Sequence, residues 1–126
     1  MTRPLANRFN CPTEFALTVL GGKWKTIIVA YLSERPCHYS ELRQLLPGLS
    51  DKVLTERLKD LQRSGLVARG KPPNSKSRPP YVLTTRGSTL RPILTDLYLW
   101  GSKHADSFGV HVGNPLKKLD GSDCGT

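Results

Sequence analysis

Residues 48–65 constrain the fold more strongly than any other stretch of this 126-residue chain. Ser50 follows a proline–glycine turn and is suited to cap a helix, because its side chain can accept a hydrogen bond from an amide left unpaired at a helix start. Gly65 stands where glycine commonly ends a helix. Between these two residues, leucines recur at the spacing of one helical face: Leu54, Leu58 and Leu61. The stretch therefore predicts an amphipathic helix.

A shorter helical pattern, residues 40–46, precedes this helix and is separated from it by about three residues. Two short helices joined in this way form a helix-turn-helix unit, whose second helix lies in the major groove of DNA. Lys52 and Thr55 lie on the N-terminal half of that helix, and both types suit contacts to bases and phosphates. A polar helix face is usually only a solvated face, so the unit alone leaves both interpretations open.

The residues after Gly65 indicate a hairpin with a basic tip. Residues 66–69 and 81–84 are rich in the residue types that strands favour, whereas prolines and small polar residues make 70–80 a loop. The loop has no acidic residue and carries three basic ones: Lys71, Lys76 and Arg78. A tip of this charge can reach phosphates or the minor groove beside the recognition helix. A helix-turn-helix unit followed by such a hairpin is a winged helix.

Helices are predicted on both sides of the winged helix. Cys11 and Pro12 open a first helix, since proline is tolerated at an early helical position where its missing amide costs nothing. A pair of glycines breaks this helix, and a second one runs from Lys23 to about Leu32. Beyond the wing, Thr85 is expected to cap one long last helix.

The predicted fold class is therefore α+β and mainly α, a winged helix-turn-helix with N-terminal helices and a long C-terminal dimerisation helix. Residues 1–10 are expected to form a basic N-terminal arm, residues 11–106 the winged-helix domain, and residues 107–126 a flexible tail rich in glycine and polar residues. A single domain of this length can bury most of the surface that its unfolded chain exposes.

The last helix carries more apolar surface than one small core normally buries. One interpretation packs all of it inward. The other, which we favour, turns part of it toward a second copy of the chain, because exposed apolar area often marks an interface. A twofold dimer would then present two recognition helices to successive major grooves. The predicted interface residues are Leu90, Ile93, Leu94, Leu97, Tyr98 and Trp100.

The charge balance favours a polyanionic partner. The chain has 19 lysines and arginines against 10 acidic residues, which gives a formal net charge of +9. Duplex DNA suits this charge, although a membrane surface or a ribosome also attracts it. The longest apolar run, residues 27–32, is far shorter than the roughly 20 residues that span a bilayer, and the N-terminus lacks the apolar segment of a signal peptide. We therefore expect a cytoplasmic protein that binds double-stranded DNA and no membrane.

The cysteines and polar residues exclude several function classes. Three cysteines at distant positions, an odd number with no C-x-x-C pair, argue against a disulfide framework and a structural zinc site. An enzyme would need a nucleophile with a base, a set of metal ligands or a phosphate-binding loop. Cys37 and His38 are adjacent, but nothing nearby completes a catalytic group. We expect neither an enzyme nor a bound metal or cofactor.

Several separated motifs occur in a recognisable order. They are Cys-Pro at 11–12, Gly-Gly-Lys-Trp-Lys at 21–25, Tyr-x-Glu-Leu-Arg at 39–43, Pro-Gly-Leu-Ser-x-Lys-x-Leu-Thr-x-x-Leu at 47–58 and Tyr-Val-Leu-Thr-x-x-Gly at 81–87. This order resembles the HxlR family over roughly residues 9–106. The resemblance implies a bacterial winged-helix transcription regulator, related in architecture to the MarR family, that acts as a homodimer on a palindromic operator. Members tend to have Arg-Val-Glu-Tyr in the wing, whereas residues 78–81 are Arg-Pro-Pro-Tyr, which removes two strand amides.

The resemblance also implies DNA contacts at matching positions of the recognition helix, at the wing arginine and at the lysines that flank Trp24. Ser50 is at least as well suited to capping as to contacting DNA. Tyr39 either reaches a phosphate through its hydroxyl or packs beneath the recognition helix. Trp24 is expected to be a core residue. The predicted DNA-binding residues are Lys23, Lys25, Tyr39, Ser50, Lys52, Thr55, Lys59, Lys76 and Arg78.

Cys11 is the candidate redox-sensing residue. It is expected where a helix begins, close to Arg8 in the sequence, and both the helix dipole and a nearby cation stabilise a thiolate. Several members of the family that this chain resembles sense oxidants or electrophiles with a cysteine at this place. The alternative is that Cys11 is an inert small hydrophobic residue.

Two further functions stay open beside the redox-responsive DNA-binding regulator. One is a basic winged-helix module that contacts RNA or another protein. The other is a regulator controlled by a small-molecule ligand. The sequence indicates no particular effector. Binding to duplex DNA in excess nonspecific competitor separates a regulator from the first of these.

Overall fold

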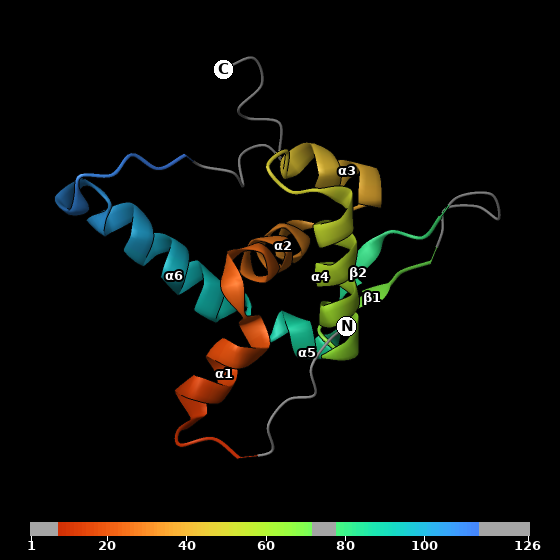
Figure 1. Ribbon diagram of the computed structural model, residues 1–126, viewed down its shortest axis with the longest axis horizontal. Helices are drawn as coiled ribbons and strands as arrows, with labels where there is room; N and C mark the ends of the chain where they lie inside the picture. Colours follow the sequence, from red (N-terminus) through yellow and green to blue (C-terminus); the bar gives the residue numbers. More distant parts are fainter. Residues whose placement is uncertain (1–7, 72–77, 114–126) are drawn as a thin grey trace.

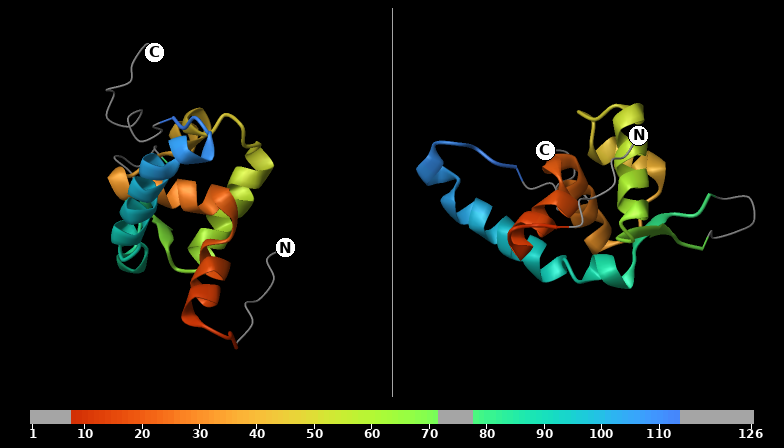
Figure 2. Two further views of the ribbon diagram at one scale, coloured as in Figure 1. Left: turned by 90° about the vertical axis from the view of Figure 1, so that its left-hand side faces the viewer. Right: turned by 60° about the horizontal axis from the view of Figure 1, so that its bottom comes forward.

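The computed structural model describes residues 8–71 and 78–113, which form a mainly helical α+β structure with one small antiparallel sheet (Figure 1). In chain order the elements are α1 (Pro12–Leu20), α2 (Gly22–Glu34), α3 (Tyr39–Leu45), α4 (Asp51–Arg63), β1 (Val67–Arg69), β2 (Tyr81–Leu83), α5 (Thr85–Ser88), α6 (Arg91–His104) and the 3-10 helix η1 (Asp106–Phe108). Helices α3 and α4 form the helix-turn-helix unit, and β1 with β2 forms the wing. The winged-helix fold class is thus confirmed. The wing and α6 lie at opposite ends of the molecule (Figure 1, Figure 2).

Helix α2 lies at the centre of the hydrophobic core. Its residues Ile28 and Val29 are completely buried. The apolar face that the sequence predicts for α4 closes the core from one side, and its leucines are at most 1% exposed: Leu54, Leu58 and Leu61. Burial of one leucine side chain contributes about 1.5–3 kcal/mol. The leucine periodicity of α4 therefore decides which face of the recognition helix packs inward and which stays free.

The two wing strands pair in antiparallel register, with Val67 opposite Leu83 and Arg69 opposite Tyr81. On its other side Tyr81 pairs with Cys37, whose amide donates to the Tyr81 carbonyl at 3.1 Å and whose carbonyl accepts from the Tyr81 amide at 2.8 Å. The extended residues before α3 thus extend the sheet by one bridge. This bridge fixes the wing to the start of the helix-turn-helix unit.

The prediction of one long last helix capped by Thr85 is wrong. Thr84 is the cap, because its Oγ1 accepts a hydrogen bond from the Gly87 amide at 3.0 Å, and the short helix α5 ends before α6 begins. Between the two helices, the amide of Leu90 donates to the carbonyl of Gly87, only three residues back, at 3.1 Å. Pro92 has no amide to continue the α-helical pattern. The chain therefore makes a tighter turn there and restarts as α6.

The apolar residues of α2 are packed into the hydrophobic core. By length and composition, no single helix among the described residues is suited to cross a membrane. Within residues 8–71 and 78–113, Pro12–Leu20 and Trp24–Glu34 are long and apolar enough only when taken together, and they are bent by 80°.

Candidate nucleic-acid interface

The recognition helix α4 is held by its cap and presents a polar face opposite the buried leucines. The Val53 amide donates to Ser50 Oγ at 3.2 Å, so the predicted capping role of Ser50 is confirmed. Lys52, Thr55 and Lys59 are exposed on the outward face of the helix. Their outward positions are those that a recognition helix needs, since its N-terminal residues contact base edges in the major groove.

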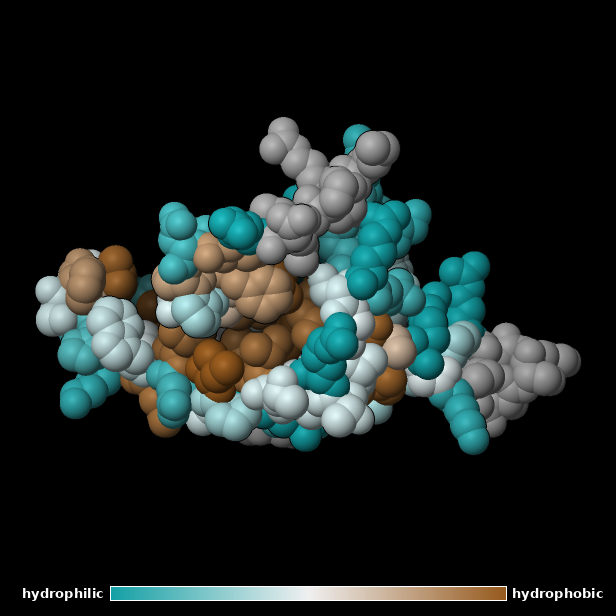
Figure 3. Space-filling model, turned by 90° about the horizontal axis from the view of Figure 1, so that it is seen from below, coloured by the Kyte–Doolittle hydropathy of each residue, from teal (hydrophilic) through white to brown (hydrophobic). Residues whose placement is uncertain are grey.

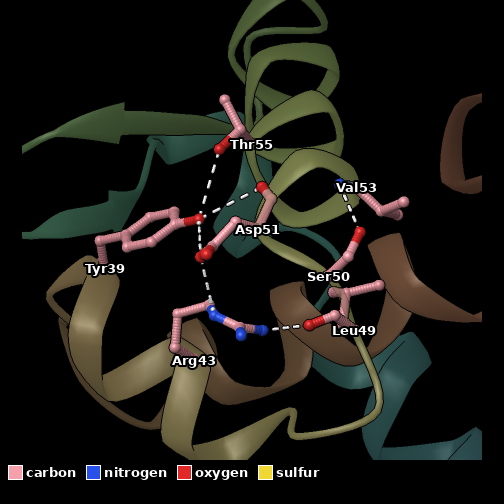
Figure 4. Close-up of polar contacts among 7 residues, drawn as sticks. All are labelled: Tyr39, Arg43, Leu49, Ser50, Asp51, Val53 and Thr55. Carbon is pink, nitrogen blue, oxygen red and sulfur yellow. Dashed lines mark hydrogen bonds and ion pairs between the residues drawn. The ribbon is translucent and has the colours of Figure 1, made fainter.

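A polar cluster ties α3 to the start of α4 (Figure 4). The Tyr39 hydroxyl lies 2.8 Å from Asp51 Oδ1, 3.2 Å from the Asp51 carbonyl oxygen and 3.3 Å from Thr55 Oγ1. Arg43 Nε forms an ion pair with Asp51 Oδ1 at 2.8 Å, and Arg43 Nη1 donates to the Leu49 carbonyl. Tyr39 therefore contacts the recognition helix itself, which favours the second of its two predicted roles. Sequence reasoning missed the roles of Arg43 and Asp51 in this cluster.

The wing lies beside α3 and forms a basic groove with it. Arg69 Nη1 donates to the Pro79 carbonyl at 2.8 Å, and the Arg69 guanidinium lies 4.0 Å from the centre of the Tyr81 ring. A cavity of about 390 Å³ opens between α3 and the wing, lined by His38, Tyr39, Ser40, Arg69, Arg78 and Pro79. Arg78 is exposed at its edge. Lys76, also predicted to bind DNA, lies outside the described residues.

Lys25, which was predicted to contact DNA, has an acidic partner within the protein. Its Nζ lies 3.9 Å from Asp60 Oδ2, and the two side chains are only 16% and 13% exposed. The same carboxylate lies 3.5 Å from both Arg57 and Arg63. Lys25 therefore joins α2 to α4, because a largely buried carboxylate needs cationic partners. Lys23 belongs to α2, and its DNA contact stays a prediction.

Comparison with known proteins identifies the family of this helix-turn-helix. Residues 19–108 match the HxlR-like helix-turn-helix family. The chain belongs to the HxlR family. YybR of Bacillus subtilis, described as an uncharacterized HTH-type transcriptional regulator, is 33% identical over 112 residues, which cover 89% of this chain and 90% of the relative. YkvN of the same organism, described in the same words, is 35% identical over 99 residues, 79% of this chain and 84% of the relative.

Solved structures agree with this assignment to the HxlR family. The redox regulator HypR in its reduced form superimposes with a TM-score of 0.73 at 32% identity, over 80% of this chain and 100% of that chain. The reduced form of the transcriptional regulator YodB from B. subtilis gives a TM-score of 0.66 at 29% identity, over 79% of this chain and 98% of that one. The protein is thus an HxlR-type, helix-turn-helix transcriptional regulator.

Helix α6 of this HxlR protein has two different apolar faces. Leu94 is only 8% exposed and belongs to the core, and Leu90 packs against the same core, so the assignment of Leu94 to an exposed interface is corrected. Ile93, Leu97 and Trp100 are 50%, 55% and 58% exposed. They recur at the spacing of one helical face. Seen from below, hydrophobic side chains gather on the side of the molecule where α1 and α6 lie (Figure 3).

Tyr98 and Leu99 line a groove between α2 and α6. Tyr98, one of the predicted interface residues, is partly buried there. Leu99 is 57% exposed and was not among the predicted residues. The groove has a volume of about 490 Å³ and adjoins the exposed apolar face of α6. Leu99 was missed because the sequence alone does not fix how α6 is rotated on the core.

The two described cysteines lie in opposite environments. Cys11 is exposed at the N-cap of α1, where its Sγ accepts a hydrogen bond from the Glu14 amide at 3.5 Å. Cys37 is completely buried, and burial raises the pKa of its thiol to about 11, against an opposing effect of Arg35 and with a smaller contribution from Glu41. Cys11 is therefore the more accessible thiol for an oxidant. Residues 8–71 and 78–113 contain no group of three or more His, Cys, Asp or Glu side chains that could hold a metal ion.

Proposed function

We propose that this HxlR regulator binds a palindromic operator sequence-specifically, as a homodimer in the cytoplasm, and responds to oxidants or electrophiles through Cys11. The observation that carries the DNA-binding part is the outward face of α4, with Lys52, Thr55 and Lys59, beside a groove lined by Arg69 and Arg78. A net charge of +9 supports a polyanionic partner.

The homodimer is supported by apolar surface that the protomer leaves exposed. Ile93, Leu97 and Trp100 of α6 form one such face, and on α1 Phe15 and Leu17 are 46% and 65% exposed. Exposed apolar surface of this kind is typical of subunit interfaces. To enter successive major grooves, the two copies of α4 in such a dimer must lie about 34–36 Å apart.

Helix and wing are expected to contribute differently to DNA binding. Lys52→Ala and Thr55→Ala should alter discrimination among sequences, since each lost base contact costs about 1–3 kcal/mol. Arg78→Ala should instead weaken binding to all duplexes and reduce its dependence on salt, because a phosphate contact releases counterions and carries no sequence information. The measurement is a titration of operator and unrelated duplexes at several salt concentrations.

Lys103→Ala is the matched control for these substitutions, because Lys103 is a basic residue exposed on α6, at the opposite end from the wing. It should change neither discrimination nor the salt dependence appreciably. The operator is best found by footprinting on the DNA that flanks the gene itself. If no duplex stays bound in excess nonspecific competitor, the alternative of a module that contacts RNA or protein is favoured. If the Lys52 and Thr55 substitutions change the affinity for no duplex, the role of α4 in recognition is refuted.

Redox control rests on the position of Cys11 and on its structural relatives. Cys11 is exposed at a helix N-terminus, where the dipole favours a thiolate. Similar solved structures include the redox regulator HypR in its oxidized form, at 34% identity and a TM-score of 0.68, and a diamide-treated YodB, at 30% identity and a TM-score of 0.61. Oxidation of Cys11 to a disulfide or adduct would change the group that begins α1. A small rotation of one protomer would then break the spacing of the two recognition helices.

Diamide is expected to lower operator affinity of the wild-type protein about a hundredfold, which corresponds to a coupling of roughly 2.7 kcal/mol. Dithiothreitol should restore it. Cys11→Ser should not respond, because it has no thiol at α1 to oxidise. The measurement is a binding titration before and after treatment.

The third cysteine of the chain is Cys124. Cys124→Ser is the matched control for the loss of one thiol, and it should respond like wild type. An equal response in Cys11→Ser would move the switch to another cysteine. A wild-type protein that does not respond at all would contradict redox control and favour the alternative of a small-molecule ligand.

A further inference from the structure

Asp51 places a carboxylate on the surface that, under the proposed function, approaches DNA. It is the first residue of α4, and its side chain is 73% exposed. The chain is strongly basic, with 19 lysines and arginines against 10 acidic residues. A negative charge near phosphates costs binding energy unless it makes a specific contact of its own. The position of Asp51 therefore requires an explanation beyond general attraction to DNA.

The polar cluster of α3 holds this carboxylate in one orientation and offsets its charge (Figure 4). Asp51 Oδ1 accepts from the Tyr39 hydroxyl and pairs with Arg43 Nε, each at 2.8 Å. Arg43 is itself fixed through Nη1, which donates to the Leu49 carbonyl. Both of these 2.8 Å contacts are made through Oδ1, and none of the hydrogen bonds among the described residues uses Asp51 Oδ2. One carboxylate oxygen is thus fixed by the protein, and the other is an available acceptor at the start of the recognition helix.

We propose that Asp51 is a specificity-determining residue that accepts a hydrogen bond from the exocyclic amine of a cytosine in the major groove. The N-terminal residues of a recognition helix contact base edges. Cytosine presents only its N4 amine there, a donor that carboxylates accept. Guanine presents two acceptors, thymine an acceptor and a methyl group, and adenine an acceptor beside its amine. Each of these acceptors repels a carboxylate, so cytosine is the base that Asp51 selects.

Tyr39 and Arg43 are positioning residues in this arrangement, since they act through Asp51. Fixing a side chain before binding reduces the conformational entropy that is lost in the complex. The guanidinium of Arg43 also lowers the repulsion between the carboxylate and the nearest phosphates. A purely structural Asp51, which only stabilises the positive end of α4, would affect all duplexes alike. If Asp51 reads a base, its substitution therefore changes the preference at one base position. If Asp51 only stabilises the helix, its substitution changes the affinity for every sequence.

The test is selection from a pool of duplexes with a randomised central segment, using the full-length wild-type protein and Asp51→Asn, followed by sequencing. Wild type should enrich two half-sites, each with cytosine at one fixed position. Asp51→Asn should lose that preference by about 5- to 150-fold while it keeps the other positions and binds nonspecific DNA at least as well. The amide can donate as well as accept, so it no longer rejects the acceptors of the other bases.

Asp106→Asn is the matched control, because it removes the same charge at an exposed residue of η1. The Asp106→Asn protein should select the same DNA sequence as the wild-type protein. An Asp51→Asn protein that enriches the wild-type sequence, or that loses every position equally, would overturn the proposal. If wild type itself enriches no sequence, the proposed operator binding fails instead, so the two failures are distinguishable.

Tyr39→Phe keeps the ring and the carboxylate but removes the hydroxyl that holds Asp51. It should still select cytosine at the same position, with a smaller preference. An undiminished preference would overturn the positioning role of Tyr39. A change of the selected base would overturn the assignment of cytosine recognition to Asp51.

Discussion

Leu97→Glu is expected to give a protein with a mass near 14 kDa in solution, where the wild type should have twice the protomer mass of 14.0 kDa. Leu97 lies between Ile93 and Trp100 on the exposed face of α6 and is itself 55% exposed. Its replacement therefore leaves the protomer core intact but places a charge in the proposed interface. Burial of an unpaired carboxylate costs several kcal/mol, more than a small apolar interface can offset. Light scattering at micromolar protein concentration measures the change.

The same substitution should lower affinity for a palindromic operator by about 10²- to 10⁴-fold, because each monomer then binds one half-site without the effective concentration that a dimer provides. Affinity for a single half-site should stay close to that of wild type. This comparison separates loss of the dimer from damage to the recognition helix.

Ser102→Ala is a suitable control, since Ser102 is an exposed polar residue of the same helix that points away from the face of Ile93, Leu97 and Trp100. It should preserve the dimer and the operator affinity. A Leu97→Glu protein that still has the mass of a dimer would place the interface elsewhere. A wild-type mass near 14 kDa would refute the proposed homodimer.

Gly87→Ala is expected to destabilise the protein by about 3 kcal/mol, near the upper end of the cost of overpacking. A Cβ at this position would overlap the carbonyl oxygen of Leu66 and would lie 3.1 Å from its carbonyl carbon and 3.2 Å from Leu83 Cδ2. The Leu66 carbonyl is fixed, because it accepts a hydrogen bond from the Thr84 amide at 3.0 Å. The chain between α4 and the wing must therefore move to admit the methyl group.

Urea unfolding at one fixed protein concentration measures this effect, since the midpoint of a dimer depends on concentration. Gly48→Ala is the matched control, because a Cβ there would lie 3.7 Å from the Trp24 ring, an ordinary contact distance. It should leave the free energy of unfolding unchanged or raise it by up to about 1 kcal/mol. Equal midpoints for the two variants would contradict the close packing of α5 on the start of β1.

The sequence determined the parts of this fold that depend on local or periodic chemistry. The leucines of α4, the cap at Ser50 and the strand pairs of the wing all lie where their pattern predicts them. A helix with one apolar face has only one way to bury that face, and a serine at a helix start finds its partner three residues away. The ordered motifs along the chain were likewise sufficient to indicate the HxlR family, which residues 19–108 match.

Only the tertiary structure decided which of several equivalent side chains face inward. Leu94 and Leu97 are the same residue type three positions apart, yet one is 8% and the other 55% exposed, because the core admits only one face of α6. In the sequence, nothing distinguishes Lys25 from the other lysines. Its contact with Asp60 arises only because α2 packs on α4. The contact of Tyr39 with Asp51 joins residues 12 positions apart, and it exists only because the turn between α3 and α4 folds one helix against the other. The burial and the contacts of these side chains depend on which elements pack together in the fold, and the type of a single residue does not specify that packing.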